Sequence, residues 1–514
     1  MRRFLIIMVA VLCAAALPLA AQTNPVSAKP ISFSMVVSTG GQRGSWNDMR
    51  MFQALEKLTN VHVNFIEIPN NGFEDRKNLM LATGDLPDAF WGSLNTNDED
   101  IYGPQGYFVT LNSLIDSDGP HVKALMQKFP LWRKTMTASD GRIYALGSIS
   151  DSPTAGPFKM RINKTWLTKL GLSMPQTTDD FENALKAFVS KDPNGNGKAD
   201  EVGMSHYEGF DNPDATFLGA FGMMYGYTNH SRMVNVFDGK VTFFRQIPAY
   251  KAYLQWMAKL WSQGLIDKQI FTQSEDEYIA KTGQNILGVQ SDMDDADWHQ
   301  FEMLDPLTSP YNKTKLTWPL NRYSAGGIAI TKLNKFPRET MRWADIFYRD
   351  VSDPWNGFSG VSVGMGQQGV DWDYTDAART KVQYLFTTPP NMGNQTVAFT
   401  KIIGPGWGAG ANIMKAPFGA DILAWAADQN RKHLFPYQNE SIMFPTAIRL
   451  DKSVADRASV LALDLKKYME QEQAKFISGE ESFDNWDKYL AALKSIGVDE
   501  YIKILQAAYD KFNK

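Results

Sequence analysis

Residues 190–203, SKDPNGNGKADEVG, place an oxygen-bearing side chain at nearly every second position. Asp192, Asn194 and Asn196 match the first, third and fifth positions of a calcium-binding loop, and Gly197 matches the sixth, where such loops turn sharply. A hard cation such as calcium takes about six to eight oxygen ligands, which alternate side chains of a tight loop can supply together. The pattern predicts a structural calcium site.

The match is incomplete at the end of this loop. An ordinary EF-hand has a glutamate at its twelfth position, where this chain has Gly203. Asp200 and Glu201 are close enough in sequence to provide the missing oxygens, and Lys198 would contribute only its main-chain carbonyl. The alternative is a solvated turn built on Asp-Pro and Asn-Gly pairs. The expected ligands are Asp192, Asn194, Asn196, Lys198 through its carbonyl, Asp200 and Glu201.

A second cluster could perform chemistry of a different kind. Asp292, Asp294, Asp295 and Asp297 crowd in front of Trp298. Paired carboxylates beside a tryptophan suit glycoside hydrolysis. Acidic residues also favour the start of a helix, where the helix dipole is positive. The cluster therefore has a structural explanation, and a secreted carbohydrate-active enzyme stays an alternative.

Other catalytic patterns lack the structural context that they need. Residues 360–364, GVSVG, match the nucleophile elbow of hydrolases, but the glycine-rich MGQQG that follows is a poor start for the required helix. Gly364, Gly366 and Gly369 have dinucleotide-loop spacing without a strand, turn and helix around them. The six histidines show no metal-ligand spacing. The glycines are better explained as one loop.

The N-terminus has the form of a secretory signal peptide. Arg2 and Arg3 precede an apolar run at residues 4–16, and small residues lead to Ala21, after which we expect cleavage. The protein is therefore expected in the periplasm or outside the cell. The single cysteine, Cys13, offers the alternative of a lipid-anchored protein.

Length and charge narrow the classes further. A chain of 514 residues is too long for one ordinary core, so two domains are expected. The net charge is −4 and the basic residues do not cluster, which argues against a nucleic-acid partner. No segment after the signal is long and apolar enough to span a membrane.

The elements that must position these residues begin with a β-α-β-α-β pattern. Strands are expected at residues 31–37, 61–68 and 88–91, separated by helices at 46–58 and 73–83. Alternation of strands with helices indicates an α/β domain with a largely parallel sheet.

Further elements follow along the chain. Thr177 is expected to cap a helix, with Asp180 as its capping-box partner, and that helix leads into the oxygen-rich loop. Residues 326–331, GGIAIT, form an apolar strand. The remaining expected elements are a strand at 142–146, helices at 164–170 and 250–263, and a helical tail at 453–514 that breaks near Gly479 and Gly497.

Several stretches together resemble a known family. They are LMLATGDLPDAF (79–90), GYFVTLNSLID (106–116), DGRIYAL (140–146), INKTWLTKLGLSMPQTTDDF (162–181), KDPNGNGKADE (191–201) and GLIDKQIF (264–271). The chain resembles the extracellular solute-binding proteins of ABC importers, family 1, and within them the large alginate-oligosaccharide-binding proteins. The resemblance also implies calcium in the loop at 192–201.

The resemblance implies a fold of the periplasmic-binding-protein class, α/β, type II-like, with two lobes, a hinge and a helical C-terminal tail. The segments expected after the signal peptide (1–21) are a first lobe at 30–148 rejoined by about 325–375, a second lobe at 149–324 continued at about 376–452, and C-terminal helices at 453–514. The strand at 326–331 resembles the segment that returns to the first sheet.

The resemblance also suggests residues that contact a sugar. Asp297 and Trp298 correspond to an Asp-Trp pair that lines the cleft in the relatives, and Trp407, in IIGPGWG, resembles a second stacking tryptophan. Trp46 and Trp91 follow or end expected strands, where parallel α/β sheets bind ligands. Arg322 would suit a uronate, and equally a neutral hydroxyl. Core packing is the alternative role for each tryptophan.

The sequence thus predicts an extracytoplasmic binding protein rather than an enzyme. We expect it to capture an oligosaccharide, with uronate-containing sugars among the candidates. As a monomer, it is expected to deliver this ligand to the permease subunits of an ABC importer, with Ca²⁺ as a structural ion. The alternatives are the carbohydrate-active enzyme and a binder of peptides or another solute, which the same architecture allows.

Overall fold

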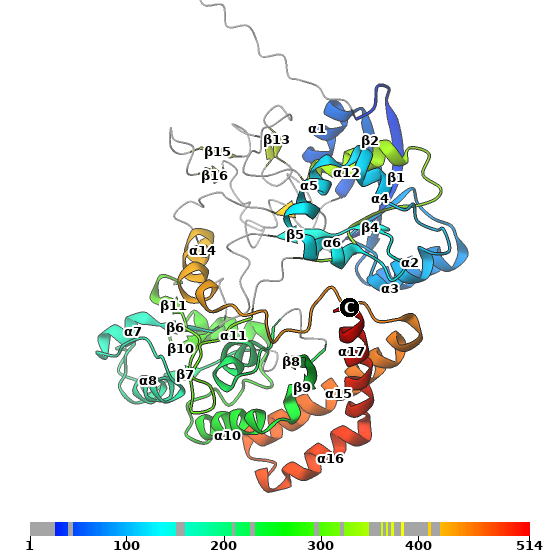
Figure 1. Cartoon of the computed structure of the whole chain (residues 1–514). Coiled ribbons are helices and arrows are strands. Elements are labelled where there is room, and N and C mark those ends of the chain that lie inside the picture. Colours follow the sequence, from blue (N-terminus) through cyan, green and yellow to red (C-terminus); the bar gives the residue numbers. More distant parts are fainter. Residues whose placement is uncertain are drawn as a thin grey trace, which may run out of the picture.

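Two lobes, each built around its own β-sheet, make up the described part of the chain (Figure 1). The computed structural model describes residues 26–39, 45–150, 160–207, 211–226, 232–291, 298–318, 323–348 and 422–513, and short strands at 361–362, 366–367, 372–374, 382–384 and 410–412. The signal peptide and Cys13 lie outside these residues. Within them, no helix combines the length and the hydrophobicity needed to cross a membrane.

The first lobe holds a five-stranded sheet in the order β2-β1-β3-β12-β4. β1 runs parallel to β2 and to β3, whereas β12 is antiparallel to both of its neighbours, β3 and β4. β2, β1, β3 and β4 therefore run in one direction, as the expected largely parallel sheet requires, and only β12, with which the chain returns from the second lobe, runs against them. Its strands are β1 (Ile31–Thr39), β2 (Val61–Pro69), β3 (Ala89–Trp91), β4 (Ala145–Leu146) and β12 (Ile328–Ile330).

Local sequence signals explain the elements around this sheet. β2 alternates as expected, with Val61, Val63 and Phe65 buried against the core. The expected helix at 46–58 begins as a 3₁₀ turn and continues as an α-helix to Thr59. The helices of this lobe are α1 (Arg50–Thr59), α2 (Phe73–Thr83), α3 (Thr96–Tyr102), α4 (Asn112–Asp118), α5 (Pro120–Lys128), α6 (Pro130–Met136) and α12 (Pro337–Asp345), with 3₁₀ turns η1 (Trp46–Asp48) and η5 (Ile346–Tyr348).

The second lobe holds a four-stranded sheet in the order β11-β6-β10-β7. β7 and β10 are parallel, and β6 is antiparallel to β10 and to β11. The strands are β6 (Arg161–Asn163), β7 (Val202–Met204), β10 (Leu287–Gln290) and β11 (Phe301–Met303), and a separate hairpin pairs β8 (Val234–Phe237) with β9 (Lys240–Phe243).

The expected capping box before the oxygen-rich loop is confirmed, since Thr177 and Asp180 exchange side-chain and main-chain hydrogen bonds at the start of α8. The helices of this lobe are α7 (Lys164–Lys169), α8 (Thr178–Ser190), α9 (Asp211–Phe217), α10 (Pro248–Ser262), α11 (Glu275–Thr282), α14 (Ile422–His433), α15 (Lys452–Ser478), α16 (Trp486–Ile496) and α17 (Val498–Phe512). The 3₁₀ turns are η2 (Leu218–Phe221), η3 (Phe244–Gln246), η4 (Trp298–Gln300), η6 (Phe435–Tyr437) and η7 (Phe483–Asn485).

The C-terminal helices belong to the core of the second lobe. Leu461 of α15 and Leu505 of α17 lie in one hydrophobic cluster with Met257 of α10. A fully buried ion pair also ties them in, because Arg245 binds Asp214 at 2.7 Å and Gln473 of α15 at 3.0 Å. The tail is therefore part of this lobe in its packing.

One pair of short strands lies where the chain leaves the first lobe. β5 (Ser148–Ser150) follows the first sheet and pairs in parallel with β17 (Gly410–Asn412). Ile149 also bridges to Tyr323, so three separate parts of the chain meet here. The other short pairs are β13 (Val361–Ser362) with β14 (Gly366–Gln367) and β15 (Trp372–Tyr374) with β16 (Val382–Tyr384).

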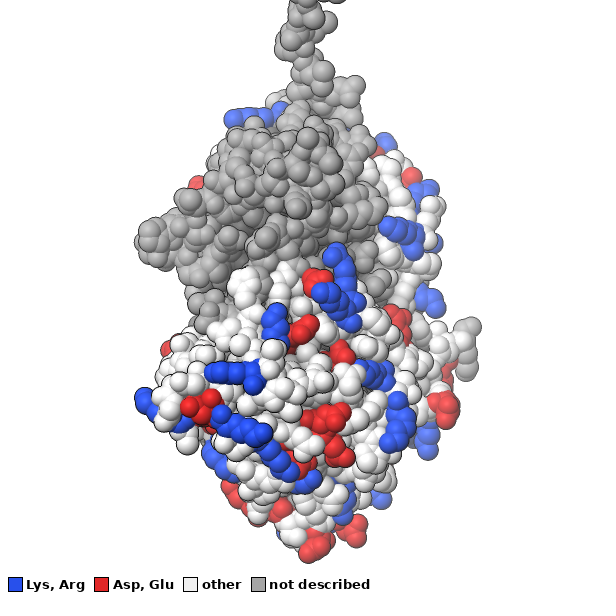
Figure 2. All heavy atoms as spheres, turned by 90° about the vertical axis from the view of Figure 1, so that its left-hand side faces the viewer, with Lys and Arg blue, Asp and Glu red and all other residues white. Residues whose placement is uncertain are grey.

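Charge on the described surface is mixed. On the face that Figure 2 shows, basic and acidic side chains of the second lobe alternate instead of forming a patch of one sign. This distribution agrees with the absence of a basic cluster in the sequence and offers no electrostatic track for a nucleic acid on that face.

Candidate functional site

One edge of the second sheet brings several polar and aromatic side chains together. Ser205 and Ser291 directly follow the parallel strands β7 and β10, so they lie at the same edge. Arg161 pairs with Gln290 across the antiparallel contact and lies at this edge too. In open α/β sheets, ligands bind outside the carboxyl ends of the parallel strands. This edge is therefore the candidate binding site of the second lobe.

Hydrogen bonds hold this edge in place. The His206 Nδ1 lies 2.5 Å from the Ser291 Oγ, and the Ser291 main-chain N–H donates to the Tyr278 hydroxyl at 2.9 Å. The Ser205 hydroxyl donates to Asp267 at 2.7 Å, and Asp267 also pairs with Lys281 at 2.6 Å. The residues that would contact a ligand thus stand on a connected polar layer.

Aromatic rings cover the same edge. The Tyr207 ring lies 5.1 Å from the Tyr278 ring and 5.0 Å from the His206 ring, between centroids. From α14, the Trp425 ring covers the Arg161 guanidinium at 5.5 Å, and that guanidinium donates to the Ser291 carbonyl at 3.0 Å. Tyr207 and Trp425 are partly exposed. They offer aromatic faces beside hydrogen-bonding groups.

Most of the sugar-contact residues that the sequence suggested cannot be placed. Asp297, Arg322 and Trp407 lie outside the described residues, as does the rest of the 292–297 acidic cluster. Trp298 begins η4, seven residues after Ser291 along the chain, and its side chain is likewise not described. Their roles stay predictions.

The structure does not support the predicted contact of Trp46 and Trp91 with a sugar. Both are buried, 4% and 3% exposed, and their ring centroids lie 5.6 Å apart in the core of the first lobe. Phe52 of α1 and Trp343 of α12 pack against Trp91. The first sheet needs a thick apolar layer under these helices, and the two indoles fill it. They present no open face to a sugar.

Three side chains at this edge were not among the residues predicted from the sequence: Arg161, Tyr207 and Trp425. Arg161 and Trp425 are remote in sequence and meet only in the folded lobe. Tyr207 had a usable signal, since Ser205, His206 and Tyr207 directly follow a strand.

A histidine fixes the far end of α14 to the sheet. The His433 Nδ1 lies 2.7 Å from Asp305, and its Nε2 lies 3.3 Å from Glu302. Lys315 pairs with Asp305 at 2.9 Å. Burial acts to raise the pKa of Asp305, but hydrogen bonds from His433 and Lys315 outweigh it and lower this pKa to about 2. The helix that carries Trp425 is thus anchored through an ionised carboxylate.

Asp305→Asn is expected to destabilise the protein at neutral pH by roughly 2 kcal/mol, about 1.4 kcal/mol per pKa unit of the shift. A carboxyl whose pKa is depressed by folding stabilises above its unfolded value and loses that contribution as pH falls towards 2. The difference between variant and wild type should therefore shrink between pH 4 and pH 2 in thermal denaturation.

Asp428→Asn is the matched control, because Asp428 pairs with Lys432 on the exposed face of the same helix. It should change little at any pH. A difference for Asp305→Asn that stays constant from pH 7 to pH 2 would contradict the electrostatic role.

The oxygen-rich loop is organised around Asp192. Its carboxylate accepts hydrogen bonds from the main-chain N–H groups of Gly195 (2.8 Å), Asn196 (3.1 Å) and Gly197 (3.0 Å). Asp192, Gly195 and Gly197 adopt positive φ values of 46°, 75° and 76°, which let the chain turn this tightly. The loop thus wraps around one carboxylate, and the tight turn that the sequence predicted is present.

The donor set of this loop fits a hard cation. The amides of Asn194 and Asn196 lie 3.2 and 3.1 Å from Asp200, and a half-turn of either amide would exchange its nitrogen for an oxygen. Glu201 has a buried carboxylate oxygen without a hydrogen-bond partner. Burial, together with the charges of Asp192 and Asp200, raises the pKa of Glu201. A cation would relieve both the repulsion and the missing contact.

The possible ligands in this loop are oxygen atoms of several kinds and do not form a cluster of acidic or histidine side chains. Across the ranges that the structure describes, no group of three or more His, Cys, Asp or Glu side chains is arranged to hold a metal ion. A calcium ion in this loop would therefore need amide and carbonyl oxygens as well as carboxylates.

No family model matches the chain. FusA of Streptococcus pneumoniae, a fructooligosaccharide ABC transporter substrate-binding protein, is 28% identical over 504 residues, which cover 95% of this chain and 92% of FusA. The structure of FusA in complex with kestose has a TM-score of 0.72 at 26% identity, covering 94% of this chain and 99% of that one. FusA has also been solved as an EF-hand mutant in complex with fructo-nystose.

Two further structures share the fold at lower identity. An HMO-binding, ABC-transporter-associated solute-binding protein from Bifidobacterium longum infantis has a TM-score of 0.80 at 22% identity, covering 95% of this chain and all 100% of that one. The alginate-binding protein AlgQ2, solved without calcium ion, has a TM-score of 0.65 at 23% identity, covering 95% and 99%. The expected two-lobe α/β fold is confirmed.

Proposed function

We propose that this chain, whose homologues are substrate-binding proteins of ABC transporters and not enzymes, captures an oligosaccharide outside the cytoplasm and delivers it to an importer. The homologue FusA is named for fructooligosaccharides. The observation that carries the proposal for this chain is the edge of the second sheet, where Tyr207 and Trp425 offer aromatic faces beside Ser291 and Arg161.

The chemistry of this edge suits a sugar. Pyranose and furanose rings expose patches of C–H that pack on aromatic faces, while their hydroxyls need a few fixed hydrogen-bonding groups. Ser291, His206 and Arg161 are such groups, and the hydrogen bonds among them keep them in place. Asp297 and Trp298, which follow in the chain, are proposed to continue the same surface, and Arg322 and Trp407 are proposed to contribute further contacts.

An oligosaccharide in the cleft is expected to close the lobes. A ligand that touches both lobes binds the closed form better, and only this difference in affinity can drive closure. Saturating oligosaccharide should therefore lower the radius of gyration in X-ray scattering and shift tryptophan fluorescence. Calcium should do neither, because residues 192–201 lie within one lobe. Tight binding with an unchanged scattering profile would argue for a rigid, preformed site.

The ligand is best identified on a glycan array that includes fructooligosaccharides, milk oligosaccharides and uronate oligosaccharides. Retention of a single class names the substrate, and retention of uronates alone would support the uronate expectation. Mass spectrometry of the eluted glycans tests the enzyme alternative, because shortened products would mean hydrolysis.

We also infer a structural Ca²⁺ in the loop at residues 192–201, held by Asp192, Asn194, Asn196, Asp200, Glu201 and the Lys198 carbonyl. The orphan oxygen of Glu201 supports it. Bound there, the ion would offset two of the three negative charges of Asp192, Asp200 and Glu201 and so fix the loop at the end of α8.

The remaining parts of the proposal concern location and partners. The signal peptide is proposed to end at Ala21 and to place a monomeric protein in the periplasm or at the cell surface, with lipidation at Cys13 as the alternative. The permease subunits of an ABC importer are the proposed protein partner. Lobe boundaries at residues 30–148 with about 325–375, and at 149–324 with about 376–452, are also proposed; the place of β12 in the first sheet supports the return of the chain to the first lobe.

A further inference from the structure

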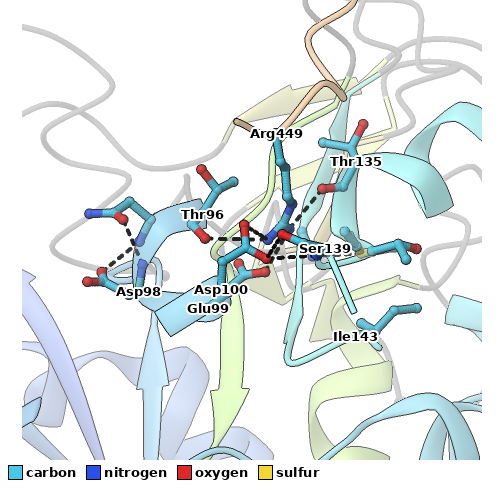
Figure 3. Close-up of polar contacts among 12 residues, drawn as sticks. Thr96, Asp98, Glu99, Asp100, Thr135, Ser139, Ile143 and Arg449 are labelled. Carbon is cyan, nitrogen blue, oxygen red and sulfur yellow. Dashed lines mark hydrogen bonds and ion pairs between the residues drawn. The ribbon is translucent and has the colours of Figure 1, made fainter. Parts of the chain in front are cut away.

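Two neighbouring residues, Ile448 and Arg449, are held by different lobes. The Ile448 side chain lies in the core of the second lobe, and its carbonyl accepts a hydrogen bond from Arg232 at 2.8 Å. The Arg449 side chain reaches into the first lobe, where its Nη2 binds the Glu99 carboxylate at 2.7 Å and the Thr135 carbonyl at 3.1 Å (Figure 3). The Arg449 side chain therefore reaches into the first lobe from a segment whose neighbouring residues, Ile448 and Leu450, pack on the core of the second.

The socket that receives Arg449 is buried and hydrogen-bonded within the first lobe. The Arg449 side chain is 7% exposed and the Glu99 side chain 0%. Asp100 lies 3.6 Å from the guanidinium and is itself held by the main-chain N–H and the hydroxyl of Ser139, each at 2.8 Å. The Thr96 carbonyl adds a longer contact at 3.5 Å. These groups come from α3, from the end of α6 and from the turn after it.

The start of α3 is fixed independently of Arg449. Asn95 and Asp98 form a capping box at its N-terminus. Asp98 also pairs at 2.8 Å with Lys77 of α2, whose side chain is fully buried. The socket therefore moves with the first lobe as one body.

A second contact joins the lobes on the same side of the molecule. The Lys134 ammonium of α6 lies 4.6 Å above the Phe512 ring at the end of α17. In Figure 1, α3 and the end of α17 lie to the right of the junction between the two lobes. Helix α14, which carries Trp425, lies to the left of it. The candidate binding edge and these contacts thus lie on opposite sides of the junction.

We propose that Arg449 in its socket is the pivot of lobe movement: the guanidinium stays bound to α3 and α6 while the far side of the junction opens and closes. Removing one partner of a buried ion pair is strongly destabilising, whereas hinge motions are absorbed by a few backbone torsions. Movement is therefore expected in the backbone around residue 449 and not in the ion pair. This inference rests on the proposed closure around an oligosaccharide.

The pivot restricts the open state as well as guiding closure. With Arg449 in place, ligand-free lobes can separate only by rotation about this point. Without the Arg449 guanidinium, the lobes are expected to sample more widely separated orientations. The orientation in which both lobes can contact the ligand is then less populated. Apparent affinity falls in proportion to that population.

Arg449→Met tests the pivot, because it keeps the length of the apolar stem and removes the guanidinium. Burial raises the pKa of Glu99 to about 7, although Arg449 acts in the opposite direction. In the variant, Glu99 without its partner can take up a proton, so the variant is expected to fold. We expect a larger radius of gyration without ligand and roughly tenfold weaker oligosaccharide binding. Arg449→Lys should restore part of both.

Arg457→Met is the matched control. Arg457 pairs with Glu500 at 2.6 Å, but both groups are exposed and lie within the second lobe. This variant should leave scattering and affinity unchanged. Glu99→Gln gives a second route to the same test, since it keeps the shape of the side chain while removing its charge, and it decides the matter if Arg449→Met does not fold.

The outcomes separate the pivot from the proposed function. A wider ligand-free scattering distribution for Arg449→Met, relative to Arg457→Met, supports the pivot even if no oligosaccharide binds the wild type, a result that would instead overturn the proposed function. A lower melting temperature with unchanged ligand-free scattering and unchanged affinity would overturn the pivot and leave Arg449 with a purely structural role.

Discussion

Removing calcium with a chelator is expected to lower the melting temperature of the protein, and added calcium to restore it. A ligand that binds only the folded state stabilises by roughly 3 kcal/mol when present at about 100 times its dissociation constant. Asp192 accepts three main-chain hydrogen bonds at the centre of the loop. Asp192→Ala should therefore abolish the response to calcium in differential scanning fluorimetry.

The control for this variant must share its backbone geometry. Asp192 has a φ of 46°, so its replacement by alanine carries a conformational cost of its own. Asp238, in the turn between β8 and β9, has a φ of 51°. Asp238→Ala should destabilise through the backbone alone and keep the full calcium response. A wild-type melting curve that is identical in chelator and in calcium would reduce the loop to a polar turn.

Trp425→Ala is expected to weaken oligosaccharide binding by about 1–3 kcal/mol, or roughly 5- to 150-fold, as is common for aromatic hot spots. The partly exposed ring offers a surface for a sugar and covers Arg161, which donates to the Ser291 carbonyl. Its loss removes the stacking surface and releases the guanidinium. Isothermal titration calorimetry with the glycan selected on the array measures the change, and the melting temperature should stay close to the wild type.

Trp261→Ala is a matched control for this measurement. Trp261 is also partly exposed and also lies beneath a cation, with the Lys268 ammonium 4.3 Å from its ring, but it belongs to α10. Affinity should not change in this variant. Equal losses in the two variants would point to a general effect of removing surface tryptophans. Trp298→Ala and Trp407→Ala in the same assay test the expectations drawn from the sequence.

Elements with strong local signals could be predicted from the sequence. The helix expected at 73–83 is α2, and it ends at Gly84 in the left-handed conformation. The breaks expected at Gly479 and Gly497 are the two ends that separate α15, α16 and α17. Each depends on residues a few positions apart, which hydrophobic spacing and glycine reveal directly.

Features that depend on pairing between remote segments were harder to predict. The sequence indicated that the strand at 326–331 is apolar but not that it runs antiparallel between β3 and β4. It indicated helices after residue 453 but not that Leu461 and Leu505 share a core with α10. Hydrophobic periodicity identifies an element and its buried face, and says little about which element covers that face.

The candidate site residues also differ in whether they are contiguous or remote in sequence. The loop at 192–201 is contiguous, so its spacing could be read along the chain. Trp46 and Trp91 were misassigned because a position at the end of a strand does not tell whether a neighbouring helix covers the ring. Arg161 and Trp425 could not be found by any local pattern, because the sheet and α14 bring them together from remote segments.

The position of β12 has a consequence for how the chain acquires its structure. β12 separates β3 from β4, although β4 is made long before it and most of the second lobe lies between them in sequence. Until that lobe has been synthesised, β3 and β4 have no partner between them and leave strand edges open to other chains. Folding of the first lobe must also wait for a long loop to close, which is slow. This order of assembly suits a chain that stays unfolded until synthesis is complete, as a chain exported in the unfolded state does. A chain that folds rapidly during synthesis would expose the open strand edges for longer.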